Sequence, residues 1–210
     1  MNDLIDALNW RYATKEFDAE RPLPAEKLEG LLEALRLSAS SFGLQPWKFV
    51  VVEDRDLRAP LVEHSWGQHQ VVDAPALIVL CRCTAFGEAD VDRLIAATAA
   101  ARGVEKESLE QYAGMMKGFL GRLDPPALRQ WMDNQIYVAL GNLLTTCAVE
   151  GVDACPMEGF SADEYDEILG LGALGLASVV LCPVGYRSSA DKYAGLAKIR
   201  YSPEDVVVRL

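Results

Sequence analysis

Apolar residues recur along the chain with two periods, and each period predicts its own kind of element. Leucine and isoleucine return every three or four positions over residues 2–11 and again over 23–38, which is the spacing of one helical face. In the second segment, Pro24 suits a first helical turn. Both segments are therefore predicted to be amphipathic helices, with apolar stripes made of Leu4, Ile5, Leu8, Leu28, Leu31, Leu32 and Leu35.

Apolar runs rich in β-branched residues predict strands at four places. These runs are WKFVVVED (47–54), ALIVLCRC (76–83), LASVVLCPVGY (176–186) and the terminal DVVVRL (205–210). The second run is almost entirely apolar, which is typical of a strand buried on both faces. Helical patterns over residues 56–66 and 88–122 lie between the runs, so helices and strands are mixed along the chain.

The most informative helix is predicted from Pro125 to Glu150. Prolines open this segment and Gly151 follows it, as expected at the two ends of a helix. Between Ile136 and Val149 it is apolar or small almost all round, which indicates burial on every side. A chain of 210 residues has little room for such a helix, so we expect it to lie between two subunits as well as inside one.

The whole pattern predicts one α+β domain over residues 1–210, in which helices predominate. No internal repeat, low-complexity run or linker divides the chain. After the long helix, Ser161 and Glu164 have the spacing of a capping box and predict a further short helix.

Charge narrows the range of partners. Twenty basic and thirty-one acidic residues give a net charge of −11, and such a field repels nucleic acid and anionic lipid. No apolar run reaches the ~18 residues of a spanning helix, and no secretory signal is evident. We therefore expect a cytoplasmic protein that binds neither nucleic acid nor membrane.

Cysteine and histidine give no sign of a metal centre or a thiol nucleophile. The five cysteines include no C-x-x-C pair, and Cys81 and Cys83 lie in a run that reads as a buried strand. The two histidines, His64 and His69, are five positions apart, which is a poor spacing for one helical face. We expect no metal site.

Four polar stretches at the ends of predicted elements are the candidates for chemistry. They are RYATK (11–15), SASSFGLQPW (38–47), CPMEGF (155–160) and AKIR (197–200). Two of them carry a basic pair, Arg11 with Lys15 and Lys198 with Arg200. Either pair alone also fits a solvated surface. In an acidic chain, two such pairs favour a local anion as their partner.

Taken in order, these stretches resemble the nitroreductase family of flavin enzymes. The pattern R-x-x-x-K, SS-x-x-x-QPW, P-x-EGF and K-x-R follows the chain with fitting spacings, and the match is weakest over about 84–125. The resemblance is greatest to the oxygen-insensitive NAD(P)H nitroreductases. It implies a three-layer fold with a central mixed sheet flanked by helices. It also implies a homodimer that binds FMN at its interface and exchanges a C-terminal strand between subunits.

The resemblance assigns roles to the basic residues. Arg11, Lys198 and Arg200 would hold the FMN phosphate, because charge-assisted bonds to phosphate are strong. Lys15 would point at the pyrimidine edge of the flavin, where a fixed cation stabilises the reduced ring, and is one candidate catalytic residue. Tyr12 and Ala13 would add backbone and packing contacts.

The remaining cofactor contacts follow from the same resemblance. The amides of Glu158, the second candidate catalytic residue, and Gly159 would meet flavin N5 and O4, and Gly159 would allow close approach of the backbone. Gln68 or Gln70 could bond flavin N3 and O2. The ring face would be covered by Pro156 and Met157, and the partner subunit's flavin would be reached by Ala39, Ser40 and Ser41.

The implied activity is a ping-pong transfer of hydride from NADH or NADPH, through FMN, to a nitroaromatic, a quinone or a similar small-molecule acceptor. No G-x-G-x-x-G fingerprint is present, consistent with donor and acceptor sharing one pocket. For the aromatic that covers the acceptor, Phe119 is the first choice and Phe42 the second, although both also fit a core. The alternatives left open are an enone, pteridine or aldehyde reductase on the same scaffold, and a non-enzymatic flavin-binding module.

Overall fold

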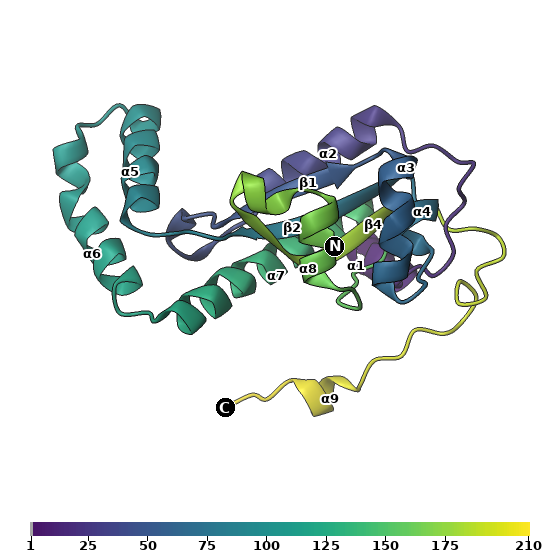
Figure 1. Ribbon diagram of the computed structural model, residues 1–210. Helices are drawn as coiled ribbons and strands as arrows, with labels where there is room; N and C mark the ends of the chain where they lie inside the picture. The colour runs from purple at the N-terminus through teal and green to yellow at the C-terminus, as the bar shows by residue number, and fades with distance from the viewer. Residues whose placement is uncertain (1) are drawn as a thin grey trace.

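The computed structural model describes residues 2–210 and is built on a four-stranded sheet (Figure 1). The strand order is β1-β2-β4-β3, and every pairing between these strands is antiparallel. The central strands β2 and β4 are the longest, and their apolar runs are buried, as the sequence predicts. The strands are β1 (Trp47–Val52), β2 (Ala76–Cys83), β3 (Asp153–Ala154) and β4 (Leu176–Gly185).

Helices cover both faces of the sheet, so the fold has three layers. Alternate residues of β2 point to opposite faces, with Ile78 and Leu80 in one hydrophobic cluster and Leu77 and Val79 in the other. The first cluster is completed by helices α2 (Ala25–Arg36) and α7 (Pro125–Val149). The second is completed by α4 (Gln70–Asp73), α8 (Ala162–Ile168) and the 3₁₀ segments η2 (Ala59–Ser65) and η4 (Leu171–Leu174). The predicted α+β class is confirmed.

Two further short helices complete this part of the fold, and the first of them leads into the site described below. Helix α1 (Asn2–Trp10) packs on α7 and delivers the chain to the polar stretch that begins at Arg11. Helix α3 (Arg55–Arg58) follows β1, and its Arg58 is buried and donates hydrogen bonds to the carbonyl oxygens of Val71 and Ala74. These contacts tie the α3 region to α4.

A separate helical lobe stands at one end of α7 (Figure 1). The predicted helical stretch 88–122 breaks at Gly103, whose φ of +64° ends a helix, into α5 and α6. The lobe has its own hydrophobic cluster around Val91 and Met116. Its elements are α5 (Glu88–Arg102), η3 (Lys106–Leu109) and α6 (Glu110–Leu120).

Helix α7 buries one side and exposes the other within a single chain. Ile136 and Leu143 are fully buried, whereas Val138 is 51% and Val149 58% exposed. The helix therefore keeps an uncovered apolar face, as expected if a second chain covers it. At α8, Ser161 occupies the N-cap position, but its side chain accepts no hydrogen bond, so the predicted capping box with Glu164 is wrong. Glu164 lies instead beside His64, at 4.0 Å.

The C-terminal tail differs from its prediction. Residues 205–210 do not form a strand; Ser202 and Asp205 form a capping box that starts a short helix, α9 (Pro203–Val206). The tail extends away from the sheet (Figure 1), and Val208 is 82% exposed. A strand needs a neighbouring strand for its backbone bonds, and within residues 2–210 the tail pairs with none. The parallel component of the expected mixed sheet is limited to the isolated bridge between Ala13 and Ala154.

No helix within residues 2–210 combines the length and the apolar character that crossing a membrane requires.

Candidate functional site

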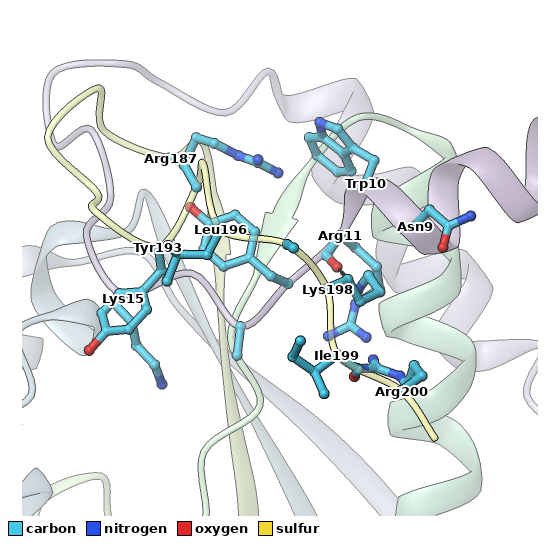
Figure 2. Close-up of a pocket in the computed structure, with 14 residues that line it drawn as sticks. Asn9, Trp10, Arg11, Lys15, Arg187, Tyr193, Leu196, Lys198, Ile199 and Arg200 are labelled. Atoms are coloured by element: carbon cyan, nitrogen blue, oxygen red, sulfur yellow. Dashed lines mark hydrogen bonds between the residues drawn. The ribbon is translucent and has the colours of Figure 1, made fainter. Parts of the chain in front are cut away.

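A cavity of about 620 Å³ lies where the segment after α1 meets the C-terminal segment (Figure 2). Its lining includes five cationic residues and no acidic one. In a protein with a net charge of −11, an acid-free cationic cavity is a local exception that attracts an anion. The cationic lining residues are Arg11, Lys15, Arg187, Lys198 and Arg200.

Three of these cations gather at one end of the cavity, as Figure 2 shows for Arg11, Lys198 and Arg200. The ammonium group of Lys198 donates a hydrogen bond to the backbone oxygen of Arg11, which joins residues 187 positions apart. Burial, Arg11 and Arg200 all lower the pKa of Lys198. Positive charge is therefore crowded at this end, and a phosphate would relieve the repulsion.

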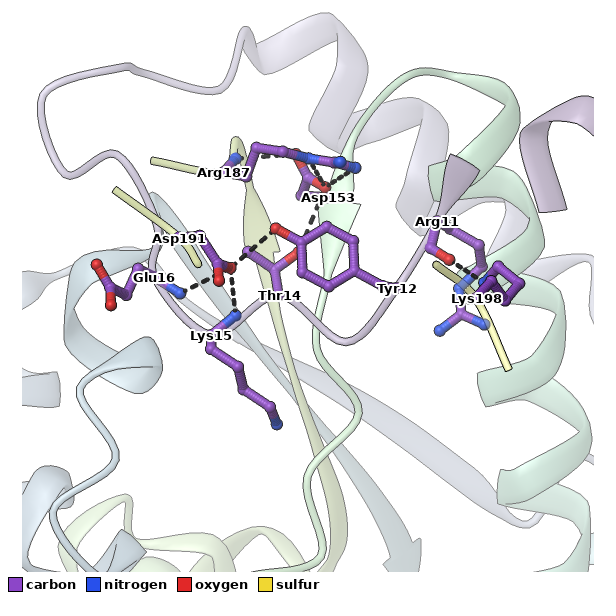
Figure 3. Close-up of polar contacts among 9 residues, drawn as sticks. All are labelled: Arg11, Tyr12, Thr14, Lys15, Glu16, Asp153, Arg187, Asp191 and Lys198. Atoms are coloured by element: carbon purple, nitrogen blue, oxygen red, sulfur yellow. Dashed lines mark hydrogen bonds and ion pairs between the residues drawn. The ribbon is translucent and has the colours of Figure 1, made fainter. Parts of the chain in front are cut away.

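A buried carboxylate holds the two walls of the cavity together (Figure 3). Asp191 is only 4% exposed, and its Oδ2 accepts hydrogen bonds from the Tyr12 hydroxyl at 2.8 Å and from the backbone nitrogens of Lys15 at 2.9 Å and Glu16 at 3.2 Å. Its Oδ1 accepts from the Tyr193 nitrogen at 3.0 Å. Burial opposes the charged form, but these bonds outweigh it and hold the pKa of Asp191 below its usual value. Burial and the contact with Asp191 raise the pKa of Tyr12 to about 12.

A second buried carboxylate, Asp153, anchors Arg187 (Figure 3). Asp153 accepts from the Arg187 backbone nitrogen and from its Nε, both at 2.8 Å, and from the Thr14 hydroxyl at 3.3 Å. The guanidinium group of Arg187 also lies 4.3 Å from the centre of the Trp10 ring and 4.5 Å from that of Tyr12. Its charge is therefore compensated, unlike that of the three clustered cations.

Lys15 connects the cavity to the stretch CPMEGF. Its ammonium group lies 3.8 Å from the sulfur of Cys155, the first residue of that stretch. Burial raises the pKa of the Cys155 thiol, although Lys15 and Arg11 act in the opposite direction. The structure thus brings together Lys15 and the turn that the sequence analysis had linked only through a cofactor.

Residues 156–159 of this turn lie outside the lining of the cavity. Met157 forms a bridge to Leu181 and is 4% exposed in the core, so its side chain belongs to the sheet packing. Pro156 is half-buried. A β-carbon on Gly159 would lie 2.7 Å from the ring of Trp66, so a larger residue there would require this exposed tryptophan side chain to shift.

Two hydrogen bonds fix the exposed side of the turn. The Gln68 amide donates to the oxygen of Gly159 at 3.0 Å and to that of Ser65 at 3.1 Å. The Glu158 side chain is exposed and accepts from the Tyr137 hydroxyl of α7 at 2.5 Å. Burial and this bond raise the pKa of Tyr137 to about 12, so it remains a donor.

The other predicted residues lie outside the cavity lining. Gln70 is buried in α4. On the loop before β1, the Ser41 nitrogen donates to Gln135 Oε1 at 2.8 Å, and Ser40 Oγ accepts from the Gln45 nitrogen at 3.0 Å. Ala39, on the same loop, is exposed. Within one chain, this loop therefore faces α7 rather than the cationic cavity.

The two aromatic candidates for the acceptor site pack in the helical lobe. The rings of Phe42 and Phe119 are 5.3 Å apart, and Phe119 lies 5.9 Å from the ring of Trp131. Both belong to the edge of the lobe's hydrophobic cluster. Of the predicted site residues, the cavity brings together Arg11, Tyr12, Ala13, Lys15, Lys198 and Arg200.

Sequence reasoning missed the residues that support the site. Asp191 and Asp153 were not singled out, because a buried aspartate has no local pattern that distinguishes it from the other acidic residues. Arg187 lies two residues after the end of β4, at a position where functional loops begin, and that is the available signal.

The sequence and the fold were compared with those of known proteins. The profile described as "Nitroreductase family" matches residues 8–186. A protein of Staphylococcus haemolyticus, whose name provisionally assigns it as an NAD(P)H nitroreductase, is 34% identical over 97% of this chain and 95% of its own. A Bacillus subtilis structure named provisionally as a nitroreductase covers 100% of both chains at 20% identity, with a TM-score of 0.89. A related structure from Exiguobacterium sibiricum, determined in complex with FMN, is 21% identical, covers 99% of this chain and 97% of its own, and has a TM-score of 0.82.

Proposed function

The chain belongs to the nitroreductase family, and we propose that it is an FMN-dependent oxidoreductase that carries reducing equivalents from NADH or NADPH to nitroaromatics, quinones or similar electrophilic acceptors. The observation that carries the proposal is the cationic, acid-free cavity at Arg11, Lys198 and Arg200. FMN ends in a phosphate, and the structurally similar protein from Exiguobacterium sibiricum was determined in complex with FMN.

The phosphate end of FMN fits the crowded cations. Arg11, Lys198 and Arg200 line one end of the cavity without an acidic neighbour in its lining, and burial together with the charges of Arg11 and Arg200 lowers the pKa of Lys198. Each charge-assisted bond to phosphate contributes ~1.5–3 kcal/mol. These three residues would bind the phosphate, and Tyr12 and Ala13 would line the cavity beside it.

The reactive end is assigned to Lys15 and the turn that follows Cys155. When bound, FMN would supply the two-electron chemistry, and the nicotinamide donor and the acceptor would occupy one pocket in turn. Lys15 would place a fixed positive charge at the pyrimidine edge. The Glu158 and Gly159 amides would donate hydrogen bonds, with the turn held in place by Gln68.

A second copy of the chain would complete the site. The loop with Ser40 and Ser41 lies outside the cavity lining in one chain, and the apolar faces of α7 and the tail are uncovered. We propose a homodimer in which α7 packs against its counterpart, the loop reaches the partner's FMN, and the C-terminal tail is exchanged. Interfaces of this intertwined kind typically bury more than ~2,000 Å².

The direct test is a flavin and donor assay. Purified protein is expected to be yellow, to release FMN on denaturation, and to bleach within seconds when NADH or NADPH is added without oxygen. A yellow protein that stays oxidised with both donors would identify a flavin-binding module instead. A protein that binds no FMN when reconstituted would refute the proposal.

The substrate class is decided by an acceptor panel. Nitro compounds, quinones, enones, pteridines and aldehydes would be ranked by kcat/KM with the preferred donor. Highest turnover of nitro compounds or quinones supports the proposed acceptors. A preference of a hundredfold or more for an enone, pteridine or aldehyde would assign the specialised reductase.

The phosphate contact is tested separately with Arg200→Ala. Loss of one charge-assisted bond is expected to weaken FMN binding about tenfold or more. Riboflavin, which has no phosphate, should bind nearly as before. Arg102→Ala, at the exposed end of α5, is the matched control and should change neither affinity. Equal losses for the two flavins with Arg200→Ala would show that Arg200 has only a structural role.

A further inference from the structure

The two walls of the cationic cavity are far apart in the sequence, and the buried carboxylate of Asp191 is bonded to both of them. We infer that Asp191 is the positioning residue of the phosphate-binding cations: it fixes the C-terminal segment that carries Lys198 and Arg200 against the segment that carries Arg11. The inference rests on the proposed function, because it concerns the phosphate end of the FMN site.

The segment that carries Lys198 and Arg200 has little structure of its own. Residues 188–202 contain no helix and no strand, and most of their side chains are exposed. Ordering such a segment costs backbone entropy at every residue, so its position must come from specific contacts. Asp191 is its one buried residue.

Asp191 is hydrogen-bonded both to residues 12–16 and to its own C-terminal segment. Its Oδ2 accepts three hydrogen bonds from residues 12–16, all between 2.8 and 3.2 Å. Its Oδ1 accepts from the Tyr193 nitrogen and starts the turn that leads to Lys198. One side chain therefore bonds to the residue that follows Arg11 and to its own segment. Farther along the two segments, the Lys198 ammonium group donates a hydrogen bond to the Arg11 backbone oxygen and links them a second time.

The charge of Asp191 and its positioning role predict opposite changes in phosphate affinity when the side chain is removed. On charge alone, losing a carboxylate from the network around the cations should strengthen the binding of an anion. If Asp191 acts by position, its loss should weaken phosphate binding, because Lys198 and Arg200 would no longer be held opposite Arg11. The sign of the change thus separates the two roles.

The experiment measures the affinity of Asp191→Ala and Asp191→Asn for FMN and for riboflavin. We expect the preference for FMN over riboflavin to fall at least tenfold in Asp191→Ala. A smaller fall is expected in Asp191→Asn, whose amide can still accept the bonds of one oxygen. Asp166→Asn is the matched control, because Asp166 accepts a backbone bond from Ser178 far from the cavity lining. Its FMN preference should not change.

A double variant tests whether Asp191 acts through the cations. If it does, the double variant Asp191→Ala, Arg200→Ala should lose clearly less FMN preference than the sum of the losses in the two single variants. An unchanged or increased FMN preference in Asp191→Ala, or fully additive losses, would overturn the inference. If Asp191→Ala does not fold, as judged by circular dichroism, Asp191→Asn gives the same comparison.

The failure of this inference can be told apart from that of the proposed function. Wild-type protein that binds neither flavin would refute the FMN assignment and the inference with it. Wild-type protein that prefers FMN, with Asp191 variants that keep the full preference, would refute the positioning role alone.

Discussion

The ammonium group of Lys15 lies 3.8 Å from the sulfur of Cys155, and this contact joins the first basic stretch to the turn before α8. The backbone nitrogen of Lys15 is bonded to Asp191, so both ends of this residue are held. Lys15 is exposed, and an exposed lysine without contacts would sample many rotamers. The contact with Cys155 favours one direction for the cation, toward the start of CPMEGF.

Replacing Lys15 should slow the proposed reaction more than it weakens cofactor binding. In Lys15→Met, we expect NADH or NADPH to reduce bound FMN about tenfold more slowly or worse, which corresponds to ~1.4 kcal/mol of barrier. The measurement is stopped-flow bleaching at saturating donor. Lys48→Met, on the exposed side of β1, is the control and should reduce at the wild-type rate. Equal rates in both variants would remove Lys15 from the chemistry.

Thiol reactivity should follow burial. Burial raises the pKa of Cys81 and Cys147 to about 12 and that of Cys182 well above its usual value, so these thiols stay neutral at pH 8. Cys83 is only half-buried. We expect iodoacetamide to label Cys83 first in the folded protein and all five cysteines after unfolding.

The labelled sites would be read by mass spectrometry after digestion. Cys83→Ser should leave the folded protein almost unlabelled. Labelling of Cys155 as fast as Cys83 would contradict the burial described here, because Cys155 is fully buried.

The crowded cations should make ligand-free protein sensitive to anions. The pKa of Lys198 is lowered, so its charged form is disfavoured in the folded state. Below that pKa, Lys198 is charged and its repulsion from Arg11 and Arg200 lowers the stability of the folded protein; the repulsion is relieved as pH rises through the pKa. Inorganic phosphate or sulfate should therefore raise the melting temperature of the FMN-free protein near pH 7. Lys198→Met should show a smaller increase, compared with chloride at equal ionic strength. An equal increase in the two proteins would argue against an anion site.

Asp191 should contribute stability at neutral pH that is lost in acid. Its folded pKa lies below the unfolded value of about 3.9, so its contribution is present above that value and lost as pH falls through the folded pKa. We expect Asp191→Asn to be about 1.5–3 kcal/mol less stable than wild type at pH 7, with the difference shrinking below pH ~4. Urea unfolding at several pH values measures this. A difference that stays constant to pH ~2.5 would contradict the bonding described.

The tail should stabilise only an assembled protein. Deleting residues 204–210 is expected to lower the melting temperature and release FMN together, because the exposed Val206, Val208 and Leu210 would otherwise pack on a second chain. Light scattering would report the oligomeric state, and absorbance the flavin content. A truncated protein that stays dimeric, yellow and equally stable would exclude the exchanged tail.

Local pattern determined much of the architecture. The period of the apolar residues gave helices α2 and α7 and strands β2 and β4, because burying one face or a whole strand constrains each segment by itself. The ordered polar stretches at element ends also indicated the family and the basic residues of the cavity. The tail shows where this reasoning ends. A valine run favours a strand, but a strand forms only beside another edge, and among the described residues 2–210 the segment 205–210 has none.

Only the tertiary structure decided which residues meet. Arg11 and Lys198 are 187 positions apart, and nothing periodic links them. Asp191 reads like any surface aspartate in the sequence, and becomes the acceptor of four hydrogen bonds because the fold buries it between two distant segments. Gly159 lies against the ring of Trp66, 93 positions away, a contact that no local pattern predicts. Periodicity encodes which face of an element is buried, whereas such contacts depend on how the elements are arranged around the sheet.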